Sequence, residues 1–407
     1  MVGNASAVEP PGVERAPWGL LLAGTVLRLL WLRDMEWKFD EKWMFAKAQR
    51  VAAGIDPWPW VGMPSGVGLE NPGLSLWPFA LLARFTQDPV AMTQAIALLN
   101  VLALWGFAYW VSATWPRDER KLGLWGVALF AVSPLPILFA RKIWAQDLLP
   151  VLLLPWLWGH SLRATRAGAV SWGLFGALLG QLHMSGFFAA ASLFAATLLH
   201  DRRKFAWLPW LAGSACGAAL MLPWLRFALS ARGHAVNAGS WSLRFFSEAF
   251  LNAWGLGLRY PLGRSHRDFL QGPEVAGMAT HAALLVRYGL YALALLALVL
   301  LIRERKRLQL SANVRVYFWS IALGGLLMSL ARVHMYAHYL IAWSPLLHIA
   351  AVWTLYRKRW ALWLLCGGQF ALSAMFLLYI HQHGGAPAAD YGTAYSHQTP
   401  EQQRIPE

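Results

Sequence analysis

Long apolar runs separated by short clusters of basic residues dominate this sequence. They are the strongest constraint on its fold, because soluble proteins avoid apolar blocks of this length and a membrane-spanning helix needs about 20 such residues. We count eleven runs, at residues 18–32, 90–115, 122–140, 148–162, 170–182, 184–199, 205–229, 282–302, 314–330, 339–356 and 360–380. The pattern predicts an all-α polytopic membrane protein.

Composition supports this class. Charged residues make up 14% of the 407 residues, against about 25% in a typical soluble domain. A disordered chain, a coiled coil and an ordinary soluble enzyme are thereby excluded. We predict one membrane domain over residues 1–407 with ten or eleven transmembrane helices. The count stays open because the two runs around His183 are short, and they form either two spans or one re-entrant hairpin.

Basic residues predict the orientation. Fifteen of them occupy five alternate linkers, which the positive-inside rule places in the cytoplasm together with the N-terminus. They are Arg117, Arg120, Lys121, Arg163, Arg166, Arg202, Arg203, Lys204, Arg303, Arg305, Lys306, Arg307, Arg357, Lys358 and Arg359. This distribution accounts for the net charge of +15 without a nucleic-acid partner. We expect a multi-pass protein of the plasma membrane whose first span is retained as an anchor.

The opposite, outer face receives two long loops, at residues 33–89 and 230–281, and a tail at residues 381–407. The tail is rich in Gly, Ala, Pro, Gln and Tyr, and we expect it to be mobile. Fourteen of the 20 Asp and Glu residues lie on this face, and none lies at the middle of an apolar run. Ion-coupled carriers usually need an intramembrane carboxylate, so this distribution favours chemistry at the outer surface.

The first outer loop contains a clear helix signal at residues 41–53. Asp40 is a candidate N-cap and Gly54 a candidate C′ residue. One face of this helix would carry Met44, Phe45, Ala48, Val51 and Ala52, and the other Lys42, Lys47, Gln49 and Arg50. Such a helix lies along the membrane surface rather than across it. A second short helix is expected at residues 74–85.

The Asp40–Glu41 pair, which follows the first span and opens this helix, resembles the GT-C superfamily of membrane glycosyltransferases. The resemblance is to the branch that holds protein O-mannosyltransferases and bacterial aminoarabinose transferases. Its first-loop pattern is matched by Trp37, Asp40, Glu41, Ala48, Val51 and Gly54. Shorter matches occur at residues 138–147 and 338–345. Relatives carry a Lys that binds the donor phosphate in a K-P-P-L element, and this chain has Asn71 at that position. Other positively charged side chains would therefore have to bind the phosphate.

The resemblance implies an inverting glycosyltransferase. It would move a monosaccharide from a polyprenyl-phosphate donor to an acceptor hydroxyl at the outer face of the membrane. Asp40 is then the candidate general base, with Glu41 as its orienting partner or an alternate base. Arg141, Lys142 and Arg332, in tight outer turns, could clamp the donor phosphate.

Further candidate substrate-binding residues are Asp147, His183, His338, Tyr339 and Glu70. Each candidate also has an ordinary structural interpretation. Asp40 and Asp147 could cap helices, and Arg141 and Lys142 could extend from helix ends to the interface. The sequence identifies no metal site and no cofactor, although it leaves a divalent metal open, since His334 and His338 are four residues apart.

Two other functions fit parts of the sequence. An O-antigen-ligase-like transferase would rely on the Arg and His residues of the 230–281 loop, and a carrier or flippase for lipid-linked sugars would need no catalytic carboxylate. The expected partners are the lipid bilayer, a polyprenyl-phosphate-sugar donor and an acceptor that is a lipid, a glycan or a protein.

Overall fold

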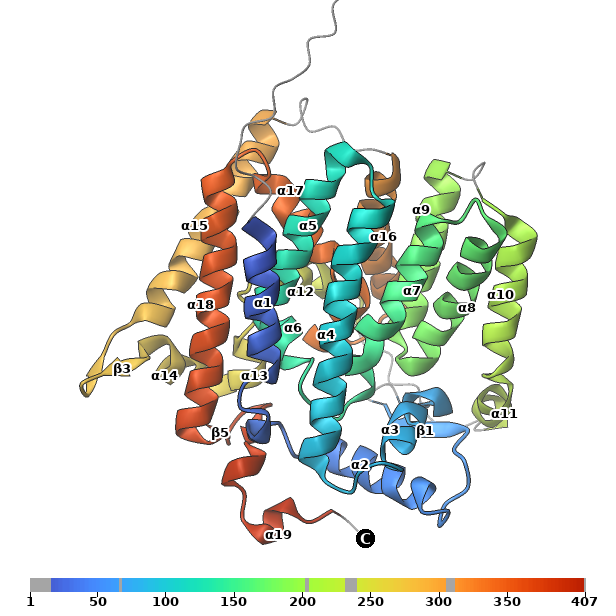
Figure 1. Cartoon of the computed structure of the whole chain (residues 1–407), viewed down its shortest axis with the longest axis horizontal. Coiled ribbons are helices and arrows are strands. Elements are labelled where there is room, and N and C mark those ends of the chain that lie inside the picture. The colour runs from blue at the N-terminus through green and yellow to red at the C-terminus, as the bar shows by residue number, and fades with distance from the viewer. Residues whose placement is uncertain (1–15, 66–67, 202–204, 231–239, 305–311, 406–407) are drawn as a thin grey trace, which may run out of the picture.

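The computed structural model describes residues 16–65, 68–201, 205–230, 240–304 and 312–405. Most of them are helical, and the long helices run side by side from one end of the molecule to the other (Figure 1). These long elements are α1 (Ala16–Leu29), α4 (Pro89–Thr114), α5 (Arg117–Val132), α7 (Leu149–Ser161), α8 (Arg166–Leu182), α9 (Ser185–Asp201), α10 (Trp207–Ala219), α15 (Ala282–Glu304), α16 (Ala312–Leu330), α17 (Leu346–Leu355) and α18 (Arg359–His383). Each apolar run of the sequence contains one of them.

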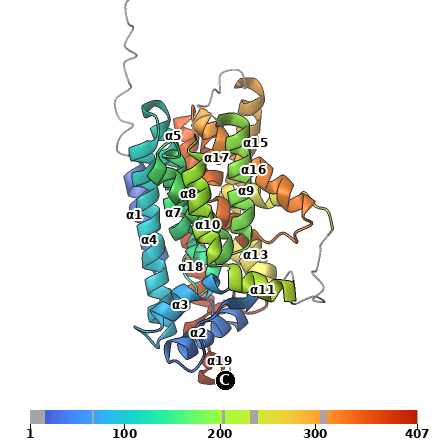
Figure 2. The same ribbon diagram turned by 90° about the vertical axis from the view of Figure 1, so that its right-hand side faces the viewer.

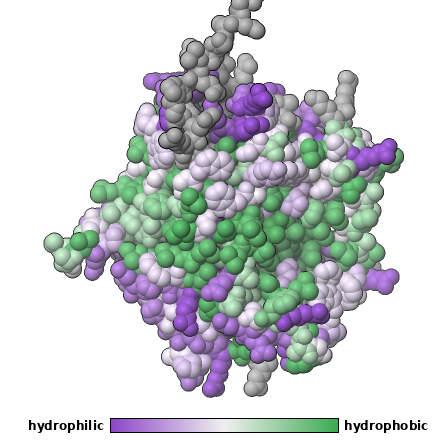
Figure 3. All heavy atoms as spheres, in the orientation of Figure 1, coloured by the Kyte–Doolittle hydropathy of each residue, from purple (hydrophilic) through white to green (hydrophobic). Residues whose placement is uncertain are grey.

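The predicted class, an all-α polytopic membrane protein, is confirmed. Among the described residues, α4, α15 and α18 are long and apolar enough to cross a membrane. A fourth span is possible if α10 and α11 (Leu222–Ser230), which meet at a bend of 59°, are one broken helix. Apolar side chains form a belt across the middle of the face drawn in Figure 3, between two hydrophilic ends. The total of ten or eleven spans stays a prediction, because the other helices are shorter.

Glycine residues allow helices to approach each other closely at two points. A Cβ at Gly24 of α1 would lie 2.3 Å from the carbonyl oxygen of Ala131 in α5. A Cβ at Gly186 would likewise lie 2.3 Å from the carbonyl oxygen of Leu179, so Gly is needed where α8 and α9 meet. Each of these two helices has 17 residues, about 25 Å of rise, and the turn at His183 joins them.

One hydrophilic end of the bundle, called the site end here, is built from the first outer loop and the tail. Its elements are α2 (Phe39–Ala52), α3 (Trp77–Leu82), the antiparallel strands β1 (Val61–Pro64) and β2 (Glu70–Pro72), and α19 (Pro400–Gln403). Figures 1 and 2 both place α2, α3 and α19 at this end. The described basic linkers, such as the one before α5, lie at the opposite end (Figure 1). Residues 202–204 and 305–307 of the basic clusters lie outside the described residues.

The amphipathic helix of the first outer loop is present, with its predicted apolar residues Met44, Phe45, Ala48 and Val51 buried. It begins two residues earlier than expected, at Phe39, so Asp40 lies in its first turn and is not its N-cap. The backbone N–H of Lys38 instead donates to Glu41 Oε2 at 3.2 Å. The second short helix is also present, as the 3₁₀ turn η2 (Gly73–Ser75) followed by α3.

The second outer loop folds into α12 (Arg244–Ala253), α13 (Arg259–Leu262), the 3₁₀ turn η4 (Gly263–Ser265), α14 (His266–Gln271) and a hairpin of β3 (Glu274–Val275) and β4 (Met278–Ala279). The short helix α6 (Pro134–Leu138) and the 3₁₀ segments η1 (Leu32–Asp34), η3 (Ala145–Leu148) and η5 (Ala337–Trp343) connect the long helices. Several site residues lie on these connections rather than on the long helices.

The tail, which we expected to be mobile, is folded up to residue 405. It forms β5 (Gly385–Ala386), β6 (Gly392–Thr393), the 3₁₀ turn η6 (Tyr395–His397) and α19. Its small side chains pack closely, since Ala386 and Ala394 are fully buried, and Tyr391 is almost fully buried. The physical reason for the difference is that the tail lies on the first outer loop, with a bridge between Glu36 and Ala394.

Candidate active site

A polar pocket of about 270 Å³ opens at the site end. The first and second outer loops, three shorter inter-helix connections and the tail all contribute to its wall. It is lined by Asp40, Met44, Met63, Pro64, Ser65, Asn71, Ser75, Trp144, Ala145, Gln146, His183, Tyr260, Tyr336, His338, Tyr339 and Asp390. A larger cavity of about 750 Å³ lies between α14 and α18 and contains none of the predicted site residues.

Asp40 is half-buried in the wall of this pocket, on the first turn of α2. Among the described residues, no side chain or backbone group forms a hydrogen bond or ion pair with its carboxylate. Burial raises its pKa, and the nearby carboxylates Asp390 and Glu36 raise it further, against the opposing charges of Lys38 and Lys142. A carboxylate with a raised pKa is a stronger base than one in water, which suits proton abstraction from a hydroxyl.

Glu41, the next residue, does not line the pocket. Its side chain is fully buried, accepts the Lys38 N–H and has Oε1 3.9 Å from Lys142 Nζ. Burial raises its pKa to about 7, and Glu36 acts in the same direction. This position fits an orienting partner that fixes the start of α2, and it does not favour the alternate-base role.

Arg141 and Lys142 lie between α6 and η3, and both already have protein partners. The guanidinium of Arg141 donates to the carbonyl oxygens of Leu27 at 3.1 Å and Trp31 at 2.8 Å. Lys142 Nζ donates to Glu36 Oε2 at 3.0 Å, and each of these two side chains is 1% exposed. Neither cation lines the pocket, so the predicted phosphate clamp is not formed by these side chains.

Lys142 is charged despite its burial. Burial itself lowers the pKa of an ammonium group, but the surrounding carboxylates, Glu36 and Glu41 foremost, together outweigh it and raise the pKa of Lys142 above its ordinary value. The ammonium also lies 4.0 Å from the centroid of the Trp144 ring, a residue of the pocket wall. Lys142 therefore supports the wall from behind.

Arg332, the third residue of the predicted clamp, is exposed and does not line the pocket. Its backbone has a φ of 54°, the left-handed region, in the turn after α16. The expected convergence of three cations on one phosphate is thus absent among the described residues.

His183, His338 and Tyr339, three of the candidate substrate-binding residues, all line the pocket. The His183 and Tyr339 rings are 5.2 Å apart, and the Trp144 and His338 rings 4.7 Å. Tyr260 OH lies 3.3 Å from His338 Nδ1. Burial lowers the pKa of His183 to about 4 and that of His338 well below its ordinary value, so both are neutral at neutral pH. The pocket has flat aromatic walls and a few polar groups that can orient a ligand.

Asp147 and Glu70 lie near the pocket but do not line it. Asp147 is fully buried, and neither of its carboxylate oxygens has a hydrogen-bond partner among the described residues. Burial raises its pKa well above the ordinary value. Glu70 lies on β2, where its backbone carbonyl accepts the indole N–H of Trp224 at 2.9 Å. Direct substrate contact by these two residues stays a prediction.

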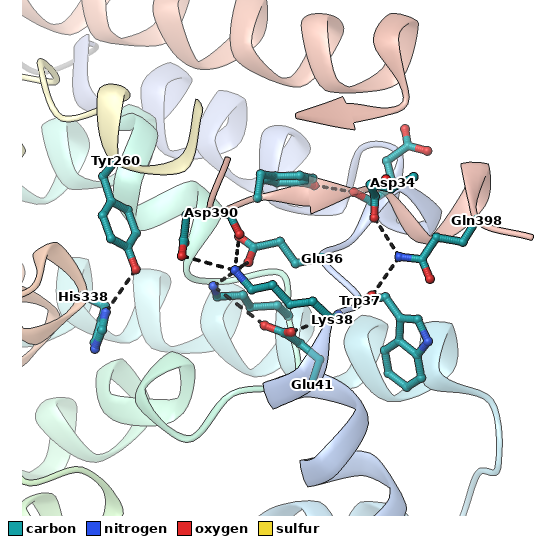
Figure 4. Close-up of polar contacts among 12 residues, drawn as sticks. Asp34, Glu36, Trp37, Lys38, Glu41, Tyr260, His338, Asp390 and Gln398 are labelled. Carbon is teal, nitrogen blue, oxygen red and sulfur yellow. Dashed lines mark hydrogen bonds and ion pairs between the residues drawn. The ribbon is translucent and has the colours of Figure 1, made fainter. Parts of the chain in front are cut away.

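Sequence reasoning missed several residues that shape the site. Lys38 Nζ lies 3.1 Å from Glu36 Oε2 and 3.4 Å from Asp390 Oδ1, so it links the first loop to the tail. Figure 4 shows Glu36, Lys38, Glu41 and Asp390 gathered in one charged cluster, with the Tyr260–His338 pair on one side. The signal for Glu36 and Lys38 was their place in the charged stretch before Asp40. Nothing in the sequence connected Tyr260 or Asp390 with that stretch.

The residues do not fit a metal site built by three protein ligands. Among the described residues, no group of three or more His, Cys, Asp or Glu side chains is arranged to hold a metal ion. His338 lines the pocket, whereas His334, its expected partner, does not. We therefore derive no step through a metal.

No protein-family model and no curated protein matches the chain. Among solved structures, the chain is similar to the apo form of the Archaeoglobus fulgidus oligosaccharyltransferase, at 13% sequence identity and a TM-score of 0.43. The match covers 97% of this chain and 60% of that protein, so the chain spans less than two thirds of its length. A similarity of this size supports no conclusion about activity.

Proposed function

We propose that the chain is an inverting membrane glycosyltransferase that uses a polyprenyl-phosphate monosaccharide as donor. The observation that carries the proposal is the position of Asp40. This carboxylate has no protein partner among the described residues, has a raised pKa, and lies in a pocket walled by aromatic side chains at the hydrophilic end of an apolar bundle. The resemblance of the Asp40–Glu41 stretch to the GT-C superfamily supports the same function.

In the proposed reaction, Asp40 accepts the proton of the acceptor hydroxyl. The acceptor oxygen then forms a bond to the anomeric carbon, and the bond from that carbon to the phosphate oxygen breaks. The phosphate leaves with the bonding electron pair, and the configuration inverts. A phosphate is already a good leaving group, so it needs charge stabilisation more than a proton.

Lys38 is the cation we assign to the phosphate in place of the Arg141, Lys142 and Arg332 clamp. Its side chain is 31% exposed, and its ammonium contacts Asp390, a residue of the pocket wall. The isoprenoid chain of the donor would remain in the apolar belt. We further propose that the site faces the outer side of the plasma membrane, since the basic linkers lie at the opposite end.

The proposal is tested with protein reconstituted in nanodiscs and a panel of polyprenyl-phosphate monosaccharides, by following release of the polyprenyl phosphate. Asp40→Asn should lower kcat by about 10² to 10⁴-fold, because a general base typically contributes that much. Asp268→Asn, the same change at an exposed acid on α14, is the matched control and should keep the wild-type rate. Wild-type turnover by the Asp40→Asn protein would remove Asp40 as the base.

The same variants separate transfer from lipid flipping. A flippase for lipid-linked sugars needs no general base, so Asp40→Asn would leave its rate of transbilayer movement unchanged. If the wild type moves sugar lipids between leaflets but releases no polyprenyl phosphate with any acceptor, the carrier interpretation replaces ours.

A further inference from the structure

The tail is fastened to the first outer loop at several points. Asp34 forms three of these contacts. Its carboxylate contacts His381 Nδ1 at 2.7 Å and accepts a hydrogen bond from Ser396 Oγ. Its backbone carbonyl accepts a hydrogen bond from the hydroxyl of Tyr391. Gln398 Nε2 donates to the carbonyl oxygen of Trp37 at 2.7 Å. Figure 4 shows Asp34, Trp37 and Gln398 on the side of the charged cluster away from Tyr260. The path of the tail past the pocket is therefore fixed by many contacts.

This path brings Asp390 into the pocket wall, where it is 36% exposed. Its Oδ1 lies 3.4 Å from Lys38 Nζ, which holds the side chain in place. Its Oδ2 is shielded from solvent and accepts no direct hydrogen bond among the described residues, and the neighbouring donor is the Tyr260 hydroxyl, whose pKa is raised by burial and by the Asp390 carboxylate. An acceptor oxygen in this state is costly unless a ligand supplies the missing donor.

The charged residues that line the pocket are all negative. Asp40 and Asp390 both line it, and none of its described lining residues is Lys or Arg. His183 and His338 are buried there and add no positive charge at neutral pH. A hydroxyl-rich neutral group can satisfy both carboxylates, whereas a ligand carboxylate in the pocket would be repelled by both.

We propose that Asp390 is a substrate-binding residue of this site, whose carboxylate accepts a hydrogen bond from a hydroxyl of the transferred sugar and excludes sugars that carry a carboxylate. Lys38 is its positioning residue. The tail is then a part of the active site. This inference rests on the proposed glycosyl transfer and adds to it the class of sugar, a neutral polyol.

The test measures binding of two probes, polyprenyl-phosphate glucose and polyprenyl-phosphate glucuronic acid, to wild-type protein, Asp390→Asn and Glu401→Gln in nanodiscs. Glu401 is exposed on α19 of the same tail, so its variant is a matched loss of one charge. The wild type should prefer glucose. Asp390→Asn should bind the glucose lipid about tenfold or more weakly, because a neutral amide oxygen accepts a weaker hydrogen bond than a carboxylate, and Glu401→Gln should be unchanged.

The ratio of the two affinities distinguishes binding from a merely structural role. A loosened tail would lower the affinities for both lipids by the same factor. Loss of the Asp390 charge should instead reduce the ratio of the affinity for the glucose lipid to that for the glucuronic acid lipid. Equal affinities of Asp390→Asn and wild type for the glucose lipid, or an unchanged ratio, would overturn the inference while leaving the transferase proposal intact. If the wild type binds neither lipid more tightly than polyprenyl phosphate alone, a sugar site is refuted, and the transferase proposal and the inference fail together.

Discussion

Asp40 and Glu41 are adjacent in the chain, yet their carboxylates lie in different surroundings. Asp40 faces an open pocket and has no protein partner among the described residues, whereas Glu41 is buried beside Lys142 and accepts the Lys38 N–H. The first turn of α2 separates two regions. One is the pocket, with Asp40 and Asp390. The other is a buried charge cluster behind it, formed by Glu36, Glu41 and Lys142, and the partly exposed Lys38 lies between the two regions.

The difference shows how one short segment can hold both a reactive group and its support. Buried charges are tolerated when they are paired, and the cluster behind the pocket pairs them. In the pocket, the Asp40 carboxylate and the Oδ2 atom of Asp390 are left for a ligand. We therefore expect changes in the pocket to alter catalysis or binding, and changes in the buried charge cluster to alter stability.

The sharpest contrast should come from the two neighbouring residues. Asp40→Asn should lose about 10² to 10⁴-fold in kcat and keep its melting temperature. Glu41→Gln should keep kcat within about tenfold, because an amide oxygen can still accept the Lys38 N–H. Turnover and thermal melts of both variants decide this. Comparable losses of kcat in both would show that the two carboxylates act as one unit.

Removing the buried cation should have the next largest effect, on stability. Lys142→Met leaves Glu36 and Glu41 in the buried charge cluster without their shared partner, which should cost about 3 kcal/mol of unfolding free energy. Lys38 still contacts Glu36 and limits the loss. Arg332→Met, at an exposed position, should stay within about 0.5 kcal/mol of wild type in the same denaturation series. A stable Lys142→Met protein would contradict the supporting role of the cluster.

The smallest expected effect concerns pH. Asp40 acts as a base only when deprotonated, and its pKa is raised above the ordinary 3.8, chiefly by burial. The kcat should therefore fall as the pH decreases through this raised pKa. Activity should be lost at a higher pH than the pKa of an ordinary Asp would give. Asp390→Asn removes one charge that raises the pKa of Asp40, so the acid limb should move to lower pH. An acid limb that moves to higher pH in Asp390→Asn would contradict the assignment of Asp40 as the base.

Local signals in the sequence predicted the elements that depend on neighbouring residues. The amphipathic pattern of α2 predicted its buried face, and sequence patterns named His183, His338 and Tyr339 as candidate site residues, which the fold brings to one pocket. Apolar run length predicted the helices of the bundle. These features follow from hydrophobic periodicity, which is local information.

Long-range pairing could not be predicted in this way. Arg141 and Lys142 look like exposed donors at the end of a run, and only the packed structure supplies the carbonyl groups and carboxylates that bind them. The tail looked mobile because it is rich in small and polar residues. Its order depends on contacts with the first outer loop. Lys38, for example, donates a hydrogen bond to the backbone carbonyl of Asp390, and these two residues are 352 positions apart in the sequence.

The long sequence separation between the first outer loop and the tail also determines when the site can form during synthesis. Chains are synthesised from the N-terminus and fold in that order. The segment from Asp34 to Lys42 is made early, but the residues that complete its surroundings follow α18. The site therefore cannot assemble until α18 has been made and the residues after it have returned to the first loop. A chain interrupted before residue 390 would contain Asp40 and the aromatic walls, but it would lack the second carboxylate of the pocket.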